Sequence, residues 1–254
     1  MNIRNLALTA VLSLTLFGCG ERTMSVGGSS GKPKTPPYAM RGADQSWPGA
    51  PGNDIQLASN LQAKNYYFVF DGSGSMEETS CGDGRQRIET AKTAFIEFIG
   101  EVSPNDNIGL FLFDYRGARQ ALALGNNQSM QMKQVIERAV PGNKTPLGAA
   151  ITVGYQQLQL QAQKQQGYGE YHLVILTDGI ASDERTMVQQ VDRISALSPI
   201  NIHTIGFCIG EGHTLNRKGI VNYQSAQNAK ELISGLRGVL AESESFDVNS
   251  FEGS

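Results

Sequence analysis

The sequence predicts an α/β fold in which a doubly wound, mostly parallel sheet is covered by helices on both faces. Four apolar runs of strand length follow one another along the chain. Each run is nearly continuous rather than alternating, as expected for strands that are buried on both faces. Segments with helical spacing of apolar residues separate the runs. With 254 residues, of which 40% are hydrophobic and 18% charged, the chain has room for one large globular domain and its attachments.

The strands are expected where the apolar runs lie. These runs are Tyr66–Phe70, Ile108–Phe113, His172–Leu176 and Ile202–Ile209. Between the second and third runs, the short segment Arg119–Leu124 alternates between polar and apolar residues. Alternation of this kind suits an edge strand, which could pair in the antiparallel sense. The core domain is therefore placed at residues 62–243.

Helices are expected between the strands, because apolar residues recur there every three or four positions. One stripe runs from Ile88 to Val102, another from Met187 to Ile194, and a last one from Leu232 to Leu240. The glutamine-rich stretch Gln156–Gln166 looks like low-complexity sequence. Nevertheless, it lies within a 3-4 apolar spacing formed by Ile151, Tyr155, Leu158 and Ala162. We interpret it as an amphipathic helix with a glutamine-rich outer face.

The first 18 residues have the pattern of an export signal. A short start that contains Arg4 precedes the apolar run Leu6–Phe17, which is too short for a stable membrane anchor. The run ends at Gly18-Cys19 and resembles the lipobox of bacterial lipoproteins, although Phe17 fills a slot that usually holds a small residue. The resemblance implies lipidation of Cys19 and a place in the bacterial cell envelope. Gly20 favours the outer over the inner membrane. An ordinary signal peptide is the alternative.

Residues 19–61 are rich in Gly, Pro and Ser and show no apolar periodicity, so they are interpreted as a flexible tether. The only tryptophan, Trp47, lies in this stretch. It could dock on the domain or contact lipid headgroups, and we favour the reading that it is an idle linker residue. Residues 244–254 are assigned to a C-terminal tail.

Charge and motifs exclude several classes of function. The formal net charge is −3, from 21 basic and 24 acidic residues, and the chain has no long run of Lys or Arg. It therefore lacks the electrostatic signature of nucleic-acid binding. It also lacks a P-loop and a dinucleotide glycine fingerprint after a strand, so no nucleotide is expected.

Polar residues gather where the predicted strands end, which is where open α/β sheets bind ligands. Asp71 follows the first run and begins the sequence Asp71-Gly-Ser73-Gly-Ser75. Asp178 follows the third run, and Thr145 lies in the loop before the glutamine-rich helix. These five residues offer only oxygen donors, which suit hard divalent cations, so Mg²⁺ or Mn²⁺ is expected there.

This pattern resembles the metal-ion-dependent adhesion site of von Willebrand factor type A domains. The resemblance covers about residues 62–243 and implies the strand order 3-2-1-4-5-6 with the third strand antiparallel. It also implies that Ser73 and Ser75 bind the cation directly and that Thr145 does so chiefly in the ligand-bound form. Asp71 and Asp178 would bind directly or through water. An Asp or Glu of a protein partner would complete the coordination.

Structural roles are expected for the remaining cysteines, histidines and acids. Cys81 and Cys208 would both lie at the metal-bearing edge, so either a disulfide or two free thiols is possible. His172 and His203 lie inside predicted strands and are expected to be packed in the core, whereas His213 lies in a loop. The acids that follow Asp178, namely Asp183 and Glu184, are expected to cap the next helix.

The function that fits best is a membrane-tethered binding module whose metal captures a partner carboxylate, either in adhesion or in assembly of an envelope complex. We expect no enzymatic activity. Aspartyl phosphatases use a second Asp where this chain has Ser73, and the segment Gly72–Met76 does not form a nucleophile elbow. Two alternatives are a metal-dependent hydrolase or phosphatase, and a domain whose metal is purely structural.

Overall fold

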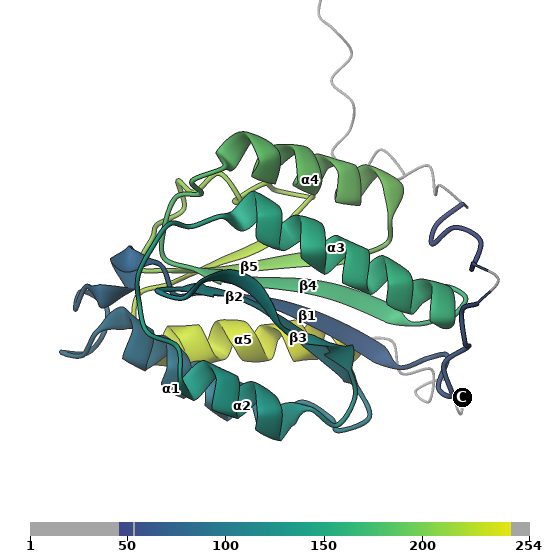
Figure 1. Ribbon diagram of the computed structural model, residues 1–254. Coiled ribbons are helices and arrows are strands. Elements are labelled where there is room, and N and C mark those ends of the chain that lie inside the picture. Colours follow the sequence, from purple (N-terminus) through teal and green to yellow (C-terminus); the bar gives the residue numbers. More distant parts are fainter. Residues whose placement is uncertain (1–45, 53, 245–254) are drawn as a thin grey trace, which may run out of the picture. The chain divides into compact units, whose positions relative to one another are not determined.

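The computed structural model describes residues 46–52 and 54–244 of the chain, and within them six strands form one sheet in the order β3-β2-β1-β4-β5-β6 (Figure 1). The strands are β1 (Lys64–Asp71), β2 (Asn107–Asp114), β3 (Gly117–Gly125), β4 (Glu170–Thr177), β5 (Asn201–Phe207) and β6 (Asn222–Ala226). All neighbouring strands are parallel except β2 and β3, which are antiparallel. The predicted fold class, strand order and antiparallel edge strand are confirmed.

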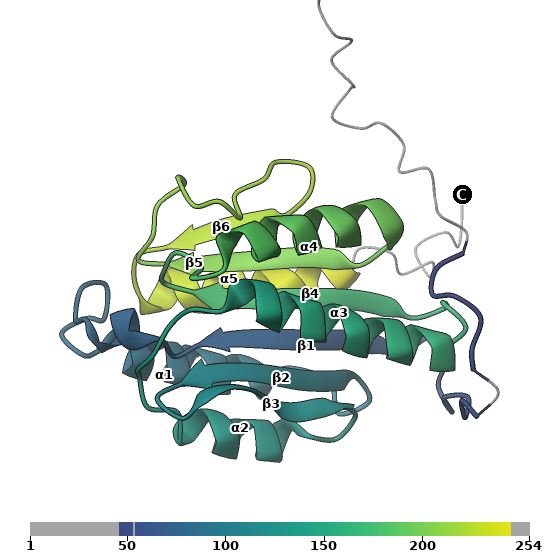
Figure 2. The same ribbon diagram turned by 45° about the horizontal axis from the view of Figure 1, so that its top comes forward.

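Helices cover both faces of this sheet (Figure 2). The helices α3 (Leu147–Lys164) and α4 (Glu184–Leu197) lie on one face. On the other face lie α1 (Arg87–Ile99), α2 (Ser129–Glu137) and α5 (Ala229–Glu244). A short 3-10 helix, η1 (Gly74–Glu77), follows β1. None of the helices among the described residues is both long and apolar enough to cross a membrane.

The core consists of two apolar layers, one on each side of the sheet. Alternate residues of β1 supply them: Tyr66 and Phe68 pack with α1 and α5, whereas Tyr67 and Val69 pack with α3 and α4. All four side chains are buried, as the continuous apolar run predicts. The buried strands hold the carboxyl ends of β1 and β4 side by side, because β1 and β4 pair in register along their length.

The residue pattern did not predict helix α2 or strand β6. Helix α2 buries only Met132 and Ile136, so its apolar stripe has too few members to stand out. Strand β6 is a short polar edge strand, and of its five residues only Ala226 is buried. Strand β5 also ends at Phe207, earlier than expected, because the backbone turns into the left-handed region at Cys208, where φ is 60°.

The reading of Trp47 as an idle linker residue is wrong. Trp47 packs against the core layer below α3 and makes an edge-to-face contact with Tyr171, with ring centroids 5.0 Å apart. Gln159 and Gln163 on α3 donate hydrogen bonds to the carbonyl oxygen of Pro48, at 3.3 and 3.2 Å. The glutamine-rich face of α3 therefore binds Pro48, a residue within the segment that was assigned to the tether.

Several predictions fall on parts of the chain that the structure does not describe. The signal peptide of residues 1–18, the lipidated Cys19, the tether up to residue 45 and the tail from residue 245 lie outside the described residues. They stay predictions.

Candidate metal centre

Three loops meet at the carboxyl ends of β1 and β4, and backbone hydrogen bonds join them. The loop after β1 is linked to the loop before α3, because Gly74 N–H donates to Asn143 O at 3.1 Å and Gly142 N–H donates to Gly72 O at 2.9 Å. The loop after β4 is linked to the same segment by Ser182 N–H, which donates to Thr145 O at 2.8 Å. The five candidate ligands are thus carried on one connected set of loops.

The hydroxyl and carboxylate oxygens of the site form a short chain of contacts. Ser73 Oγ lies 3.1 Å from Ser75 Oγ, and Ser75 Oγ donates to Asp178 Oδ1 at 2.6 Å. Thr145 is nearly buried. Gly179 lies between Thr145 and Ser75. A Cβ atom added to Gly179 would lie 3.4 Å from Ser75 Oγ and 3.9 Å from Thr145 Oγ1, so both hydroxyl groups border the same residue. The structure therefore brings Ser73, Ser75, Thr145 and Asp178 to one place.

Asp71 lies at the base of this group and is fully buried. Ser73 N–H donates to Asp71 Oδ1 at 2.8 Å, and the hydroxyl of Thr177 donates to Asp71 Oδ2 at 2.5 Å. Burial and the nearby charge of Asp178 raise the pKa of Asp71 to about 6. Burial also raises the pKa of Asp178, although hydrogen bonds from Ser75 and Arg87 act in the opposite direction.

The donor set fits a hard divalent cation. Two buried carboxylates whose ionised forms are disfavoured would gain from a positive charge placed between the loops, and all the donors are oxygens. Within the described part of the chain, no three His, Cys, Asp or Glu side chains lie close enough together to hold a metal ion. A cation at this edge would therefore depend on the hydroxyl groups of Ser73, Ser75 and Thr145 as well as on the two aspartates.

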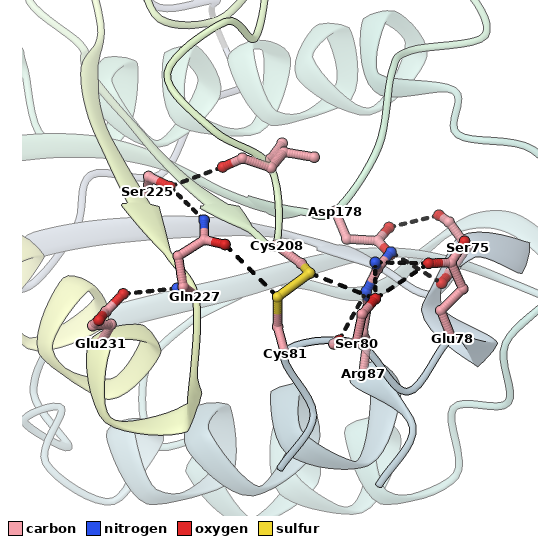
Figure 3. Close-up of a disulfide and its surroundings, with 11 residues drawn as sticks. Ser75, Glu78, Ser80, Cys81, Arg87, Asp178, Cys208, Ser225, Gln227 and Glu231 are labelled. Carbon is pink, nitrogen blue, oxygen red and sulfur yellow. Dashed lines mark hydrogen bonds and ion pairs between the residues drawn. A yellow bond between two sulfur atoms is a disulfide. The ribbon is translucent and has the colours of Figure 1, made fainter. Parts of the chain in front are cut away.

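Arg87 is a member of the site that the residue pattern did not predict. Its guanidinium donates from Nη1 to Asp178 Oδ2 at 2.9 Å and to the carbonyl oxygen of Ser75 at 3.4 Å. It also bonds Ser80 and forms an ion pair with Glu78, as Figure 3 shows. Arg87 is only 7% exposed, so its charge is fixed inside the site rather than presented to solvent. The only signal in the sequence is a basic residue at the first position of a helix, which the helix dipole disfavours.

A further acid ends a strand, as Asp71 ends β1, but it has different partners. Asp114 ends β2 and is fully buried. Burial raises its pKa, but ion pairs and hydrogen bonds with Arg119 and Arg116 outweigh this effect and lower the pKa overall. Two guanidinium groups thus satisfy Asp114, which leaves it unsuited to a metal.

Cys81 and Cys208 are joined by a disulfide, with an S–S distance of 2.08 Å. The bond links the loop after η1 to the residue that follows β5 (Figure 3). Both half-cystines have positive φ angles of 60°. Ser80, the residue before Cys81, accepts a hydrogen bond from the guanidinium of Arg87. The disulfide therefore fixes the loop that contains one of the partners of Arg87.

The three histidines differ in their burial and in the partners of their ring nitrogens. His172 and His203 are buried, as expected, and their ring nitrogens Nδ1 and Nε2 lie 3.1 Å apart. His213 lies beside the site, where its Nε2 contacts Gly179 O at 2.9 Å and its Nδ1 accepts from Leu215 N–H at 3.2 Å. Both nitrogens of His213 are therefore engaged with the backbone.

The expectation that the Asp183 side chain caps the helix after Asp178 is wrong. Although Asp183 occupies the N-cap position of α4, its carboxylate accepts hydrogen bonds from Gly148 N–H and Ala149 N–H, each at 2.9 Å, at the start of α3. Gly148 allows this approach, since a Cβ there would lie 2.6 Å from the backbone nitrogen of Met187. Asp183 thereby joins the Thr145 loop to the Asp178 loop.

We expect Asp183→Ala to lower the free energy of unfolding by about 1–2 kcal/mol, because two N–H groups at the start of α3 lose a charged acceptor. Chemical denaturation measures the change. Asp192→Ala is a matched control, since Asp192 lies on α4, its side chain is more than half exposed, and it pairs with Arg217 rather than with the start of α3. Equal stabilities of the two variants would contradict the role given to Asp183.

Comparisons with known proteins agree with this architecture. A curated relative from Synechocystis sp., "Uncharacterized protein sll0103", is 28% identical over 172 residues, which cover 63% of this chain and 38% of the relative. The pilus adhesin SpaC from Lactobacillus rhamnosus GG matches with a TM-score of 0.58 at 15% identity, over 74% of this chain and 31% of SpaC. The manganese-loaded TRAP protein of Plasmodium vivax matches with a TM-score of 0.51 at 16% identity, over 69% of this chain and 72% of that protein.

The two structural matches show the fold alone, because their sequence identities are low. The chain spans well under half the length of both the curated relative and SpaC. The family itself is shown by the sequence, since residues 65–248 match the model of the von Willebrand factor type A domain. This chain therefore belongs to the von Willebrand factor type A domain family.

Proposed function

We propose that this domain is a protein-binding module that depends on a divalent cation, Mg²⁺ or Mn²⁺, held by Asp71, Ser73, Ser75, Thr145 and Asp178. The observation that carries the proposal is the convergence of these oxygen donors at one sheet edge, with Ser75 Oγ in contact with both Ser73 Oγ and Asp178 Oδ1. A bound cation would supply positive charge with an open coordination position. A carboxylate from the partner would take that position.

The surface around the loops suits a protein partner. Tyr115 follows β2 and is 57% exposed, and Ile180 follows Gly179 and is 74% exposed. Asn143 donates hydrogen bonds to the carbonyl oxygens of Asp114 and Tyr115, which fixes Tyr115 next to the loop that carries Thr145. Exposed aromatic and apolar side chains beside a charged centre are typical of interface anchors. We infer that the partner presents an acidic residue with apolar neighbours.

The same contacts favour binding over hydrolysis. Hydrolysis at a metal site commonly needs a general base, and His213 is the histidine nearest to the loops. Its two ring nitrogens are used by Gly179 O and Leu215 N–H, so it acts as a brace between loops. We therefore propose that the domain is not an enzyme. Phosphatase assays with Mg²⁺ and Mn²⁺ should show no turnover above the Asp71→Ala background.

The place of the domain in the cell rests on the N-terminal sequence. Lipidation of Cys19 would tether the chain to the bacterial envelope, with the outer membrane favoured. The fold shared with the pilus adhesin SpaC agrees with a role in adhesion, and assembly of an envelope complex uses the same chemistry. The TRAP protein, which shares this fold, was solved loaded with manganese, and this agrees with a cation in the present domain.

Crosslinked affinity capture from native envelopes tests this function. We expect the full chain in Mg²⁺ to retain a partner, and we expect EDTA or Asp71→Ala to abolish retention. Asp192→Ala, which removes a surface carboxylate outside the site, should retain the partner as the wild type does. Equal capture under all conditions would contradict a metal-dependent interface. If EDTA lowers the melting temperature without affecting capture, the metal is structural.

A further inference from the structure

We propose that Arg87 is a built-in counter-charge of the metal centre, which weakens cation binding and leaves the bound cation with a net positive charge for an acidic partner. This inference rests on the proposed function, because it concerns the same five ligands. It adds a residue that determines how strongly, and with what charge, the site holds its metal.

The guanidinium of Arg87 contacts Asp178, one of the two candidate carboxylate ligands. Its Nη1 is 2.9 Å from Asp178 Oδ2, while Ser75 Oγ occupies the other carboxylate oxygen at 2.6 Å. The side chain of Asp178 is fully buried and that of Arg87 is 9% exposed, so water screens this pair poorly. Any cation bound through Asp178 would share that carboxylate with Arg87.

A count of charges gives the consequence. Asp71 and Asp178 alone would neutralise a divalent cation, and an additional partner carboxylate would then make the centre negative. With Arg87 included, the fixed groups sum to one negative charge, so the loaded centre is positive by one. A partner carboxylate brings it to neutrality. Metal and acidic partner should therefore bind with positive coupling, because each offsets a charge that the other leaves.

Arg87 is held too firmly to leave when a metal enters. Besides Asp178, it contacts Ser75 O, Ser80 O and Ser80 Oγ, and it pairs with Glu78 at 2.7 Å (Figure 3). Ser80 precedes Cys81, whose disulfide fixes the loop to the end of β5. Glu78 offsets the charge of Arg87 only in part, because its side chain is 61% exposed and screened by solvent.

The test is a titration of Mn²⁺ into the full chain in detergent, with dissociation constants measured by electron paramagnetic resonance. Arg87→Gln keeps a hydrogen-bond donor but removes the charge, and it should bind Mn²⁺ at least about tenfold more tightly than the wild type. Arg87→Lys keeps the charge and should stay within about threefold of the wild type. Glu78→Gln removes a negative charge that acts on both Arg87 and Asp178, and it should weaken Mn²⁺ binding about twofold or more.

Arg116→Gln is the matched control, because Arg116 pairs with Asp114 in the neighbouring loop, and it should leave the Mn²⁺ affinity within about twofold. Unchanged or weaker binding by Arg87→Gln would overturn the inference. If Arg87→Gln does not fold, Arg87→Met, which fills the same buried space without a charge, decides: tighter Mn²⁺ binding than the wild type supports the inference, and unchanged or weaker binding overturns it. If the wild type and Asp71→Ala bind Mn²⁺ equally, the proposed function itself fails.

Discussion

Loss of the Cys81–Cys208 disulfide is expected to lower the free energy of unfolding by about 2–5 kcal/mol. The two half-cystines are 127 residues apart, so the bond restricts a long loop of the unfolded chain. For a domain of this size the melting temperature should fall by roughly 5–15 °C. Calorimetry of the double variant Cys81→Ser/Cys208→Ser against the oxidised wild type measures the difference.

A reductant provides the internal control. It should lower the melting temperature of the wild type toward that of the double variant and leave the double variant unchanged. Coincident melting curves for the oxidised wild type and the double variant would contradict the prediction.

The buried pair His172 and His203 is expected to make the fold sensitive to acid. Burial, with the nearby charges of His203 and Lys64, lowers the pKa of His172 to about 3, and burial lowers the pKa of His203 to about 4. The unfolded chain takes up protons near pH 6.5, where the folded pair does not. The stability contributed by the neutral pair is therefore complete above about pH 6.5 and is lost as the pH falls toward 4.

The loss should amount to roughly 4–6 kcal/mol by pH 4 relative to a variant without the pair. Because Asp71 has a raised pKa and works in the opposite direction, the informative quantity is a difference between proteins. Denaturation of the wild type and of His172→Gln/His203→Gln from pH 7 to pH 4 measures it. His213→Gln should keep most of the wild-type slope, because the buried pair His172 and His203 remains in this variant. Parallel profiles for the wild type and the double variant would refute the assignment.

The sequence predicted the central strands well because their signal is local. Strands β1, β2 and β4 are continuous apolar runs, and their burial follows from the helices on both faces. Strand β6 could not be found from its own residues, because a polar edge strand is defined by its pairing with β5. Helix α2 was missed because two buried residues do not make a visible stripe.

The site residues divide in the same way, into those marked by their local sequence and those defined by contacts with distant parts of the chain. Asp71 and Asp178 could be named from the sequence because each comes directly after an apolar run; Asp71 ends β1 and Asp178 follows β4. Arg87 could not, since its bond to Asp178 joins residues 91 positions apart and depends on the path of the disulfide-linked loop. The misreading of Asp183 has the same origin, because its partner Gly148 lies 35 residues earlier on another helix. Trp47 was misread because its binding surface is formed by α3 and Tyr171.

The most direct test of the metal centre removes only uncharged ligands. In Ser73→Ala/Ser75→Ala both carboxylates remain, so a cation attracted by charge alone would still bind. We expect calorimetric titration to show one Mn²⁺ bound by the wild type and by Ser103→Ala, a control at an exposed loop serine. The double variant should bind at least about tenfold more weakly, because it lacks two neutral oxygen ligands. Equal Mn²⁺ affinity of the double variant and the wild type would contradict the assignment of these hydroxyls as ligands, and with it the central claim.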